Sequence, residues 1–143
     1  MSGLYLPKTT DVIPLKGIVR VPPEEFVMSY DIDTGDWFRQ WVSLLDQDET
    51  KSRVGVHIHF SDESRCSLDE STRIICKMNR TGKTFSTQVR CLKPGMTCLS
   101  YTSRHNAVYV ERLELSKPVF VNRFIPKFHQ ALVVGPGIVI CGS

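Results

Sequence analysis

The chain has 143 residues, of which 41% are apolar and 23% charged, and these values predict one globular domain with its own core over residues 1–143. The net charge of +3 is mild and the Lys and Arg residues are spread along the chain, so no nucleic-acid partner is expected. The start of the chain has no signal-peptide pattern, and no stretch approaches the roughly 20 apolar residues of a membrane span. The cytosol is therefore the expected compartment.

The alternation of apolar and polar residues with a period of two predicts half-buried strands in an antiparallel, all-β protein. Gly, Pro and Asn turn signals separate these strands. Many short strands at this spacing are typical of a sandwich or a jelly roll. In chain order, we expect strands at residues 12–21, 25–32, 54–61, 73–78, 85–91, 96–102, 107–114, 118–124, 131–134 and 137–141.

Residues 33–53 depart from the strand pattern, because their apolar residues follow a helical spacing and Thr34 or Asp36 could cap the start. We expect a short helix or an inserted loop here. The two tryptophans have two interpretations. Trp37 and Trp41 either pack on the core or cover a sheet edge, or they form an apolar patch that binds a partner or a second copy of the chain.

The most informative stretch lies between Arg73 and Arg90. An apolar strand is followed there by a polar Gly turn and then by Phe85, with polar residues three and five positions later. Such a hairpin can bring Lys77, Phe85, Gln88 and Arg90 together on an exposed sheet surface. An array of this kind suits recognition of a small polar ligand better than it suits catalysis.

The cysteines are odd in number and include no Cys-x-x-Cys pair, so neither a disulfide framework nor a zinc ribbon is expected. His57 and His59 lie two residues apart and could form a metal pair, but no carboxylate or thiol with ligand spacing accompanies them. We therefore expect no metal and no other cofactor. Reduced thiols are expected at Cys66, Cys76, Cys91, Cys98 and Cys141.

Several segments, taken in order, resemble the galectins. Residues 56–60 (Val-His-Ile-His-Phe) are similar to the strand that carries the family's sugar-binding histidine, and residues 85–90 (Phe-Ser-Thr-Gln-Val-Arg) resemble its Trp-x-x-Glu-x-Arg motif. Residues 74–77, 120–124 and 133–140 resemble other strands of the family. The resemblance implies a galectin-type jelly-roll sandwich of two antiparallel sheets. It also implies a β-galactoside groove on the concave face of one sheet, with neither metal nor covalent chemistry.

The resemblance further implies a set of sugar-binding positions. Two of them, His59 and Arg90, match the family pattern, and the others depart from it. Phe85 can stack on a sugar ring with less area than a tryptophan, and Arg65 can offset the positive charge that is lost at Glu63. The predicted carbohydrate-binding residues are His57, His59, Ser61, Arg65, Lys77, Phe85, Gln88 and Arg90.

These features predict a galectin-like lectin that binds a β-galactoside or an acidic or otherwise modified glycan. The alternative is a galectin-fold protein that has lost sugar binding and acts through protein–protein contacts or as a homodimer. Catalysis is not expected, because a triad built from Cys66 or Ser61 with His59 and Glu63 would lie along one strand. Galectins are made without a signal peptide and also act outside cells after unconventional export, so the resemblance allows an extracellular location as well.

Overall fold

Thirteen strands and two short 3-10 helices form the part of the chain that the structure describes. The structure is a computed structural model that describes residues 4–7, 11–12, 19–20, 24–46, 52–126 and 131–141, with side chains in 28–40, 54–115 and 131–141. The 3-10 helices are η1 (Val89–Cys91) and η2 (Arg104–Asn106). The strands are β1 (Leu4–Pro7), β2 (Asp11–Val12), β3 (Val19–Arg20), β4 (Glu24–Tyr30), β5 (Trp37–Asp46), β6 (Ser52–Phe60), β7 (Arg65–Asp69), β8 (Arg73–Lys77), β9 (Thr84–Gln88), β10 (Thr97–Leu99), β11 (Ala107–Pro126), β12 (Ala131–Val134) and β13 (Ile138–Cys141).

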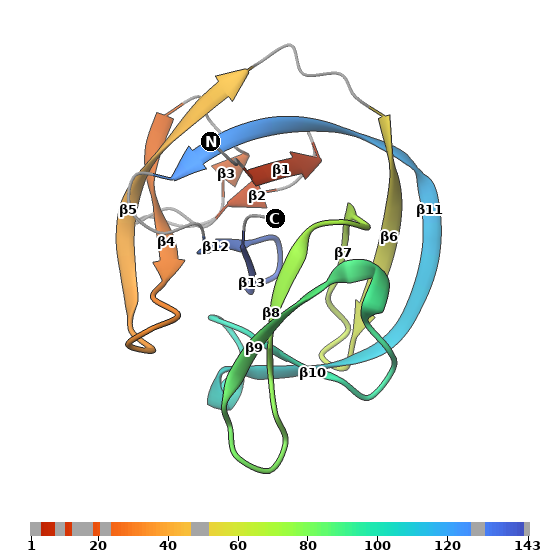
Figure 1. The fold of residues 1–143 in the computed structure, drawn as a ribbon. Coiled ribbons are helices and arrows are strands. Elements are labelled where there is room, and N and C mark those ends of the chain that lie inside the picture. The colour runs from red at the N-terminus through yellow and green to blue at the C-terminus, as the bar shows by residue number, and fades with distance from the viewer. Residues whose placement is uncertain are drawn as a thin grey trace.

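The strands pair antiparallel in an order that closes on itself. The order runs β10-β8-β13-β12-β4-β5-β11, and a further pairing between β10 and β11 joins the two ends of this path. β6 pairs with β11 from Val110 to Phe120, and β7 pairs with β6. Figure 1 shows β11 curving around one side of the molecule. The result is a closed ring of strands with a β6–β7 extension.

The length and curvature of β11 make this closure geometrically feasible. It pairs with β10 at residues 107–109, with β6 between Val110 and Phe120, and with β1 and β5 between Val121 and Pro126. Its register against β6 shifts between Val110 and Arg112 and again between Ser116 and Val119. Bulges of this kind bend a strand and increase its twist. Pro118 lies within the second shift, where its missing N–H interrupts the ladder least.

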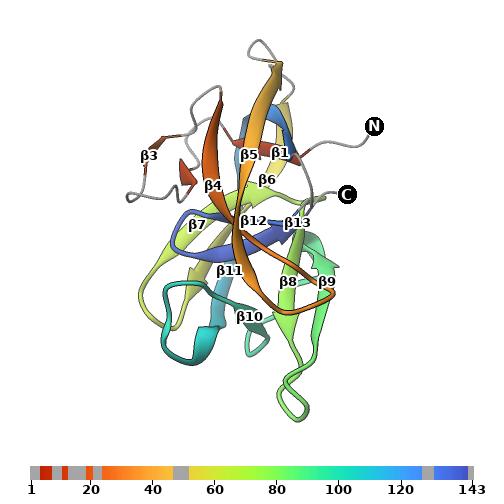
Figure 2. The same ribbon diagram turned by 90° about the vertical axis from the view of Figure 1, so that its left-hand side faces the viewer.

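The core follows from the alternation along the strands. On β6, Val56, Ile58 and Phe60 point inward and are buried, whereas His57 and His59 point outward. β12 and β13 are buried throughout because they lie in the middle of the ring, between β4 and β8. Figure 2 shows this hairpin crossing the molecule between the β4–β5 pair and the β8–β9 pair.

The antiparallel, all-β character predicted from the sequence is confirmed. The single strand expected at residues 12–21 is wrong, because β2 and β3 lie there and pair with each other. The end of the strand expected at residues 85–91 forms η1. The galectin-type sandwich of two sheets is wrong. A sandwich needs two sheets with separate edges, whereas β11 contributes to both sides of the molecule and closes the path through β10.

The helix or loop expected within residues 33–53 is also wrong for the part that the structure describes. β5 begins at Trp37 and pairs with β4 along its whole first part and with β11 near its end. Backbone partners on both sides outweigh the helical spacing of its apolar residues. Among the described residues, no helix is long and apolar enough to cross a membrane.

Candidate functional site

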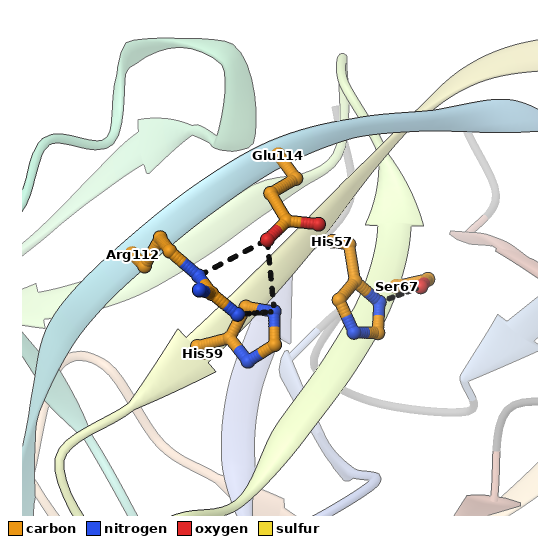
Figure 3. A network of polar contacts seen from close by, with 5 residues as sticks. All are labelled: His57, His59, Ser67, Arg112 and Glu114. Atoms are coloured by element: carbon orange, nitrogen blue, oxygen red, sulfur yellow. Dashed lines mark hydrogen bonds and ion pairs between the residues drawn. The ribbon is translucent and has the colours of Figure 1, made fainter.

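Two histidines stand side by side on the outer face of β6 (Figure 3). The rings of His57 and His59 meet edge to face, with their centroids 4.7 Å apart. Strand register places Glu114 and Ser67 on either side of His57, and Arg112 and Arg65 on either side of His59. Two polar rows therefore cross β11, β6 and β7. We call these six residues the histidine cluster.

Direct contacts join most members of the histidine cluster. His57 Nδ1 lies 2.6 Å from Ser67 Oγ. Arg112 Nε lies 3.0 Å from Glu114 Oε1, and its terminal nitrogen lies 3.2 Å from His59 Nε2. His59 Nε2 is also 3.6 Å from the same Glu114 oxygen. Because a guanidinium only donates, His59 Nε2 is the acceptor in its hydrogen bond with Arg112.

The environment of His57 predicts a pH effect on stability. Burial lowers the pKa of His57 below its usual value of 6.5, positive charge on His59, Arg65 and Arg112 adds to this, and Glu114 opposes it. The unfolded chain then binds more protons than the folded chain just below pH 6.5, so this residue's stabilisation is complete above that pH and declines as the pH falls through the folded pKa. NMR titration of the His57 ring should give a midpoint below 6.5.

The variant that tests this pH effect is His57→Gln, because a glutamine side chain cannot be protonated in this pH range. The loss of unfolding free energy on going from about pH 7.5 to about pH 5 should be smaller in this variant than in the parent protein. His105→Gln serves as the control, because His105 lies in the exposed η2 turn. A His57 midpoint at or above 6.5 would contradict this account.

A second polar cluster lies where the last strand ends. Arg73 on β8 is the register partner of Cys141 on β13 and of Gln88 on β9. Its Nε donates to Ser86 Oγ at 3.1 Å and a terminal nitrogen donates to the Ser86 carbonyl at 3.1 Å. Burial raises the pKa of the Cys141 thiol, while Arg73 and a hydrogen bond with Ser86 oppose the shift. We call Arg73, Ser86 and Cys141 the β13 cluster.

The remaining thiols differ in their surroundings. Cys76 and Cys98 face each other across β8 and β10, fully buried, with their sulfurs 4.0 Å apart. Their hydrogen bond raises the pKa of Cys98 and lowers that of Cys76. Burial raises the pKa of Cys66 to about 12. Cys91 is exposed, Cys66 has intermediate exposure, and the other three are buried.

The residues predicted to bind carbohydrate fall into separate groups. His57, His59 and Arg65 belong to the histidine cluster. Ser61 follows β6, and its Oγ accepts a hydrogen bond from the Tyr109 N–H at 3.1 Å, which ties the end of β6 to β11.

The other predicted residues lie at opposite ends of the β8–β9 hairpin. Lys77 and Phe85 line one hollow at the turn. Gln88 is half-buried opposite Arg73, and exposed Arg90 lies in η1. The structure therefore does not bring these four side chains together as one array.

The tryptophan segment is only partly described. The Trp37 ring lies 4.9 Å from the Tyr30 ring and 5.0 Å from the Tyr101 ring, against a buried cluster of the core. This placement fits the interpretation in which the tryptophan packs on the core. The side chain of Trp41 lies outside the described residues. Within the described part of the chain, no group of three or more His, Cys, Asp or Glu side chains is placed to hold a metal ion.

Sequence reasoning missed the partners of the histidines and all of the β13 cluster. Arg112 and Glu114 are two positions apart in the sequence, which predicts that they share one face of a strand. Only the register of β11 against β6 shows that they lie opposite His59 and His57. Arg73 and Ser86 lie on the β8–β9 hairpin, but Cys141 lies on β13, far along the sequence, so no local signal joins it to them.

Known proteins match this chain in structure but not in sequence. No protein-family model matches the chain, and no curated protein matches its sequence. An intein from a hyperthermophile superposes with a TM-score of 0.75 at 13% identity, over 96% of this chain and 98% of the other. A bacterial intein-like domain from Clostridium thermocellum gives 0.71 at 17% identity, over 100% and 99%. The Msm DnaB1 intein splicing domain bound with zinc gives 0.65 at 17% identity, over 96% and 99%.

The chain therefore shares its fold with inteins, and the galectin resemblance is wrong. The predicted lectin function and the predicted glycan partner rested on that resemblance, so both are wrong as well. The alternative of a galectin fold without sugar binding is overturned by the same finding.

Proposed function

We propose that this chain is an intein-like protein-splicing domain that acts on peptide bonds at its own ends within a longer polypeptide. The observation that carries the proposal is the extent of the structural match, which leaves almost no part of the chain or of the inteins unmatched. The likeness therefore involves the whole fold and not a shared hairpin. The proposal replaces the expectation that the protein catalyses no reaction.

The β13 cluster supplies suitable chemistry beside one end of the chain. Exchange of a backbone amide needs a nucleophile, a proton donor for the leaving amine and positive charge near the carbonyl oxygen. Arg73 provides the fixed positive charge, held by two hydrogen bonds to Ser86. Because burial raises the pKa of Cys141, its thiol keeps its proton at neutral pH and gives it up only to a strong base, such as the nitrogen that leaves as the C–N bond breaks.

In the proposed step, a hydroxyl or thiol attacks the carbonyl carbon of a peptide bond just beyond β13. A C–O or C–S bond forms as the C–N bond breaks, and the nitrogen takes one proton and leaves as an amine. Cys141 supplies this proton, and the proton that the nucleophile loses restores the Cys141 thiol, so the (thio)ester forms without any added reagent. Arg73 stabilises the negative charge that develops on the carbonyl oxygen, and Cys141 gives its proton to the leaving nitrogen.

The test is a fusion in which the chain lies between two carrier proteins of different mass. We expect separated or joined carriers to accumulate after purification. Cys141→Ala should reduce them by at least about a hundredfold, which is the lower end of the usual contribution of an acid–base group. Cys91→Ala is the matched control, since it also removes a thiol but lies in η1, outside the β13 cluster. A folded fusion that yields neither separated nor joined carriers after purification would refute the proposal.

A further inference from the structure

The distribution of charge along the chain is uneven. Residues 71–110 contain seven Lys and Arg residues and no Asp or Glu, whereas the rest of the chain contains eleven Lys and Arg residues and all fifteen acidic residues. The cations are indeed spread along the chain, and it is the carboxylates that avoid this segment. A stretch of forty residues with one sign of charge favours a negatively charged partner.

The same segment forms a hollow of about 600 Å³ at the turn between β8 and β9. We call it the Phe85 pocket. Its apolar part consists of Met78, Phe85 and Met96, and the Phe85 and Met78 side chains are 40% and 50% exposed. Exposed apolar residues of this size in a concave site are typical of a binding pocket.

Three cations line the Phe85 pocket, and no carboxylate does. Lys77 Nζ donates to the His105 carbonyl at 3.4 Å, which positions it at the rim. The side chains of Arg80 and Lys93 are exposed, and neither forms an ion pair with any described residue. The acidic residue next along β11 is Glu111, which lines a different hollow beside His59. The pocket thus combines an apolar floor with uncompensated positive charge.

We propose that the Phe85 pocket binds single-stranded nucleic acid. One base stacks on the exposed ring of Phe85, and the neighbouring phosphates contact Lys77, Arg80 and Lys93. An acidic peptide would use the three cations but would leave the exposed aromatic ring without a specific role. Tyr109, which is 54% exposed, offers a second ring, since strand register places it beside Thr97 and Thr97 beside Lys77. The inference is independent of the proposed peptide-bond chemistry.

The test is fluorescence anisotropy with a labelled oligothymidine of about 12 nucleotides, within the site sizes known for single-strand binding. We expect binding that weakens steeply between about 50 mM and about 200 mM salt. Phe85→Ala should weaken it about tenfold and Phe85→Tyr should preserve it, because only the second keeps the flat ring. The Arg80→Ala/Lys93→Ala double variant should lower the slope of the salt dependence by about 1.4, since each phosphate contact on a single strand contributes about 0.7.

Two controls separate this site from general attraction of charge. Leu115→Ala removes an exposed apolar side chain, and Arg39→Ala removes an exposed cation, both outside the pocket. Neither should weaken binding. The proposal is overturned if Arg39→Ala weakens binding as much as the pocket variants do, if Phe85→Ala has no effect, or if a glutamate-rich peptide of equal charge displaces the oligonucleotide equally well. A dissociation constant above about 10⁻⁴ M would also overturn it.

Discussion

Phe60→Ala is expected to lower the free energy of unfolding by about 3–5 kcal/mol. Phe60 ends β6 with its side chain only 1% exposed, within the larger of the two core clusters. Ile58 and Val110 belong to the same cluster, and their strands are held in register, so the surroundings cannot collapse into the space that the ring leaves. The loss therefore includes both the lost burial of the ring and the cost of the cavity.

The measurement is urea unfolding followed by circular dichroism. Phe60→Leu fills most of the same volume and should lose clearly less than Phe60→Ala. Leu115→Ala is the control for a large apolar side chain, because Leu115 is 81% exposed and should change stability by less than about 0.5 kcal/mol. Equal losses for Phe60→Ala and Leu115→Ala would show that Phe60 is not in the core.

Gly137→Ala should be the second strongly destabilising change, with a loss of about 2–4 kcal/mol. Gly137 is the last residue of the turn that joins β12 to β13, and its φ of +120° lies in a region that other residues rarely adopt. An added Cβ would overlap Thr102 Oγ1 and lie 3.1 Å from Thr102 Cβ. Its N–H and carbonyl are bonded to Val134 and Tyr101, so the backbone cannot easily move away.

Gly82→Ala is the matched control for Gly137→Ala. Gly82 also has a positive φ, of +68°, but a Cβ there would meet no atom within 4 Å. Its expected loss is about 1 kcal/mol, from backbone conformation alone. In a double-mutant cycle, Thr102→Ala should recover part of the Gly137→Ala loss, because it removes two of the atoms in conflict. Similar losses for the two glycine variants would contradict the predicted steric overlap.

The positions of individual strands could be predicted from the sequence, because the patterns that indicate them involve neighbouring residues. On β6 the alternation of Val56, Ile58 and Phe60 with two histidines predicts both the strand and its buried face. Residues 137–141 were readable for a different reason, since a short apolar run after a Gly-Pro-Gly turn is typical of a buried strand.

The sequence alone did not predict which distant strands pair. Trp37 to Asp46 satisfies a helical spacing, and only its position between β4 and β11 makes it a strand. The predicted break between residues 114 and 118 is a bulge within β11, because β6 continues to supply backbone partners on both sides of Pro118. This continuous strand closes the ring and separates the fold from a two-sheet sandwich.

In the candidate sites, too, the sequence predicts single strands and their faces but not the contacts between strands. His57 and His59 could be identified as outward-facing neighbours on one strand, but their contacts with Glu114 and Arg112 depend on the register with β11. The β13 cluster joins residues from β8, β9 and β13, which lie up to one half of the chain apart. Such a cluster has no sequence signal until the order of strands is known.

The central claim is that this domain removes itself from, or cuts, the polypeptide in which it lies. The most direct test is the intact mass of the products from the fusion between two carriers. We predict a product that contains both carriers in one chain and is lighter than the fusion by the 16.3 kDa of this domain, or else two separated carriers. A folded fusion that retains its full mass, in the parent protein and in the Cys141→Ala variant alike, would contradict the account.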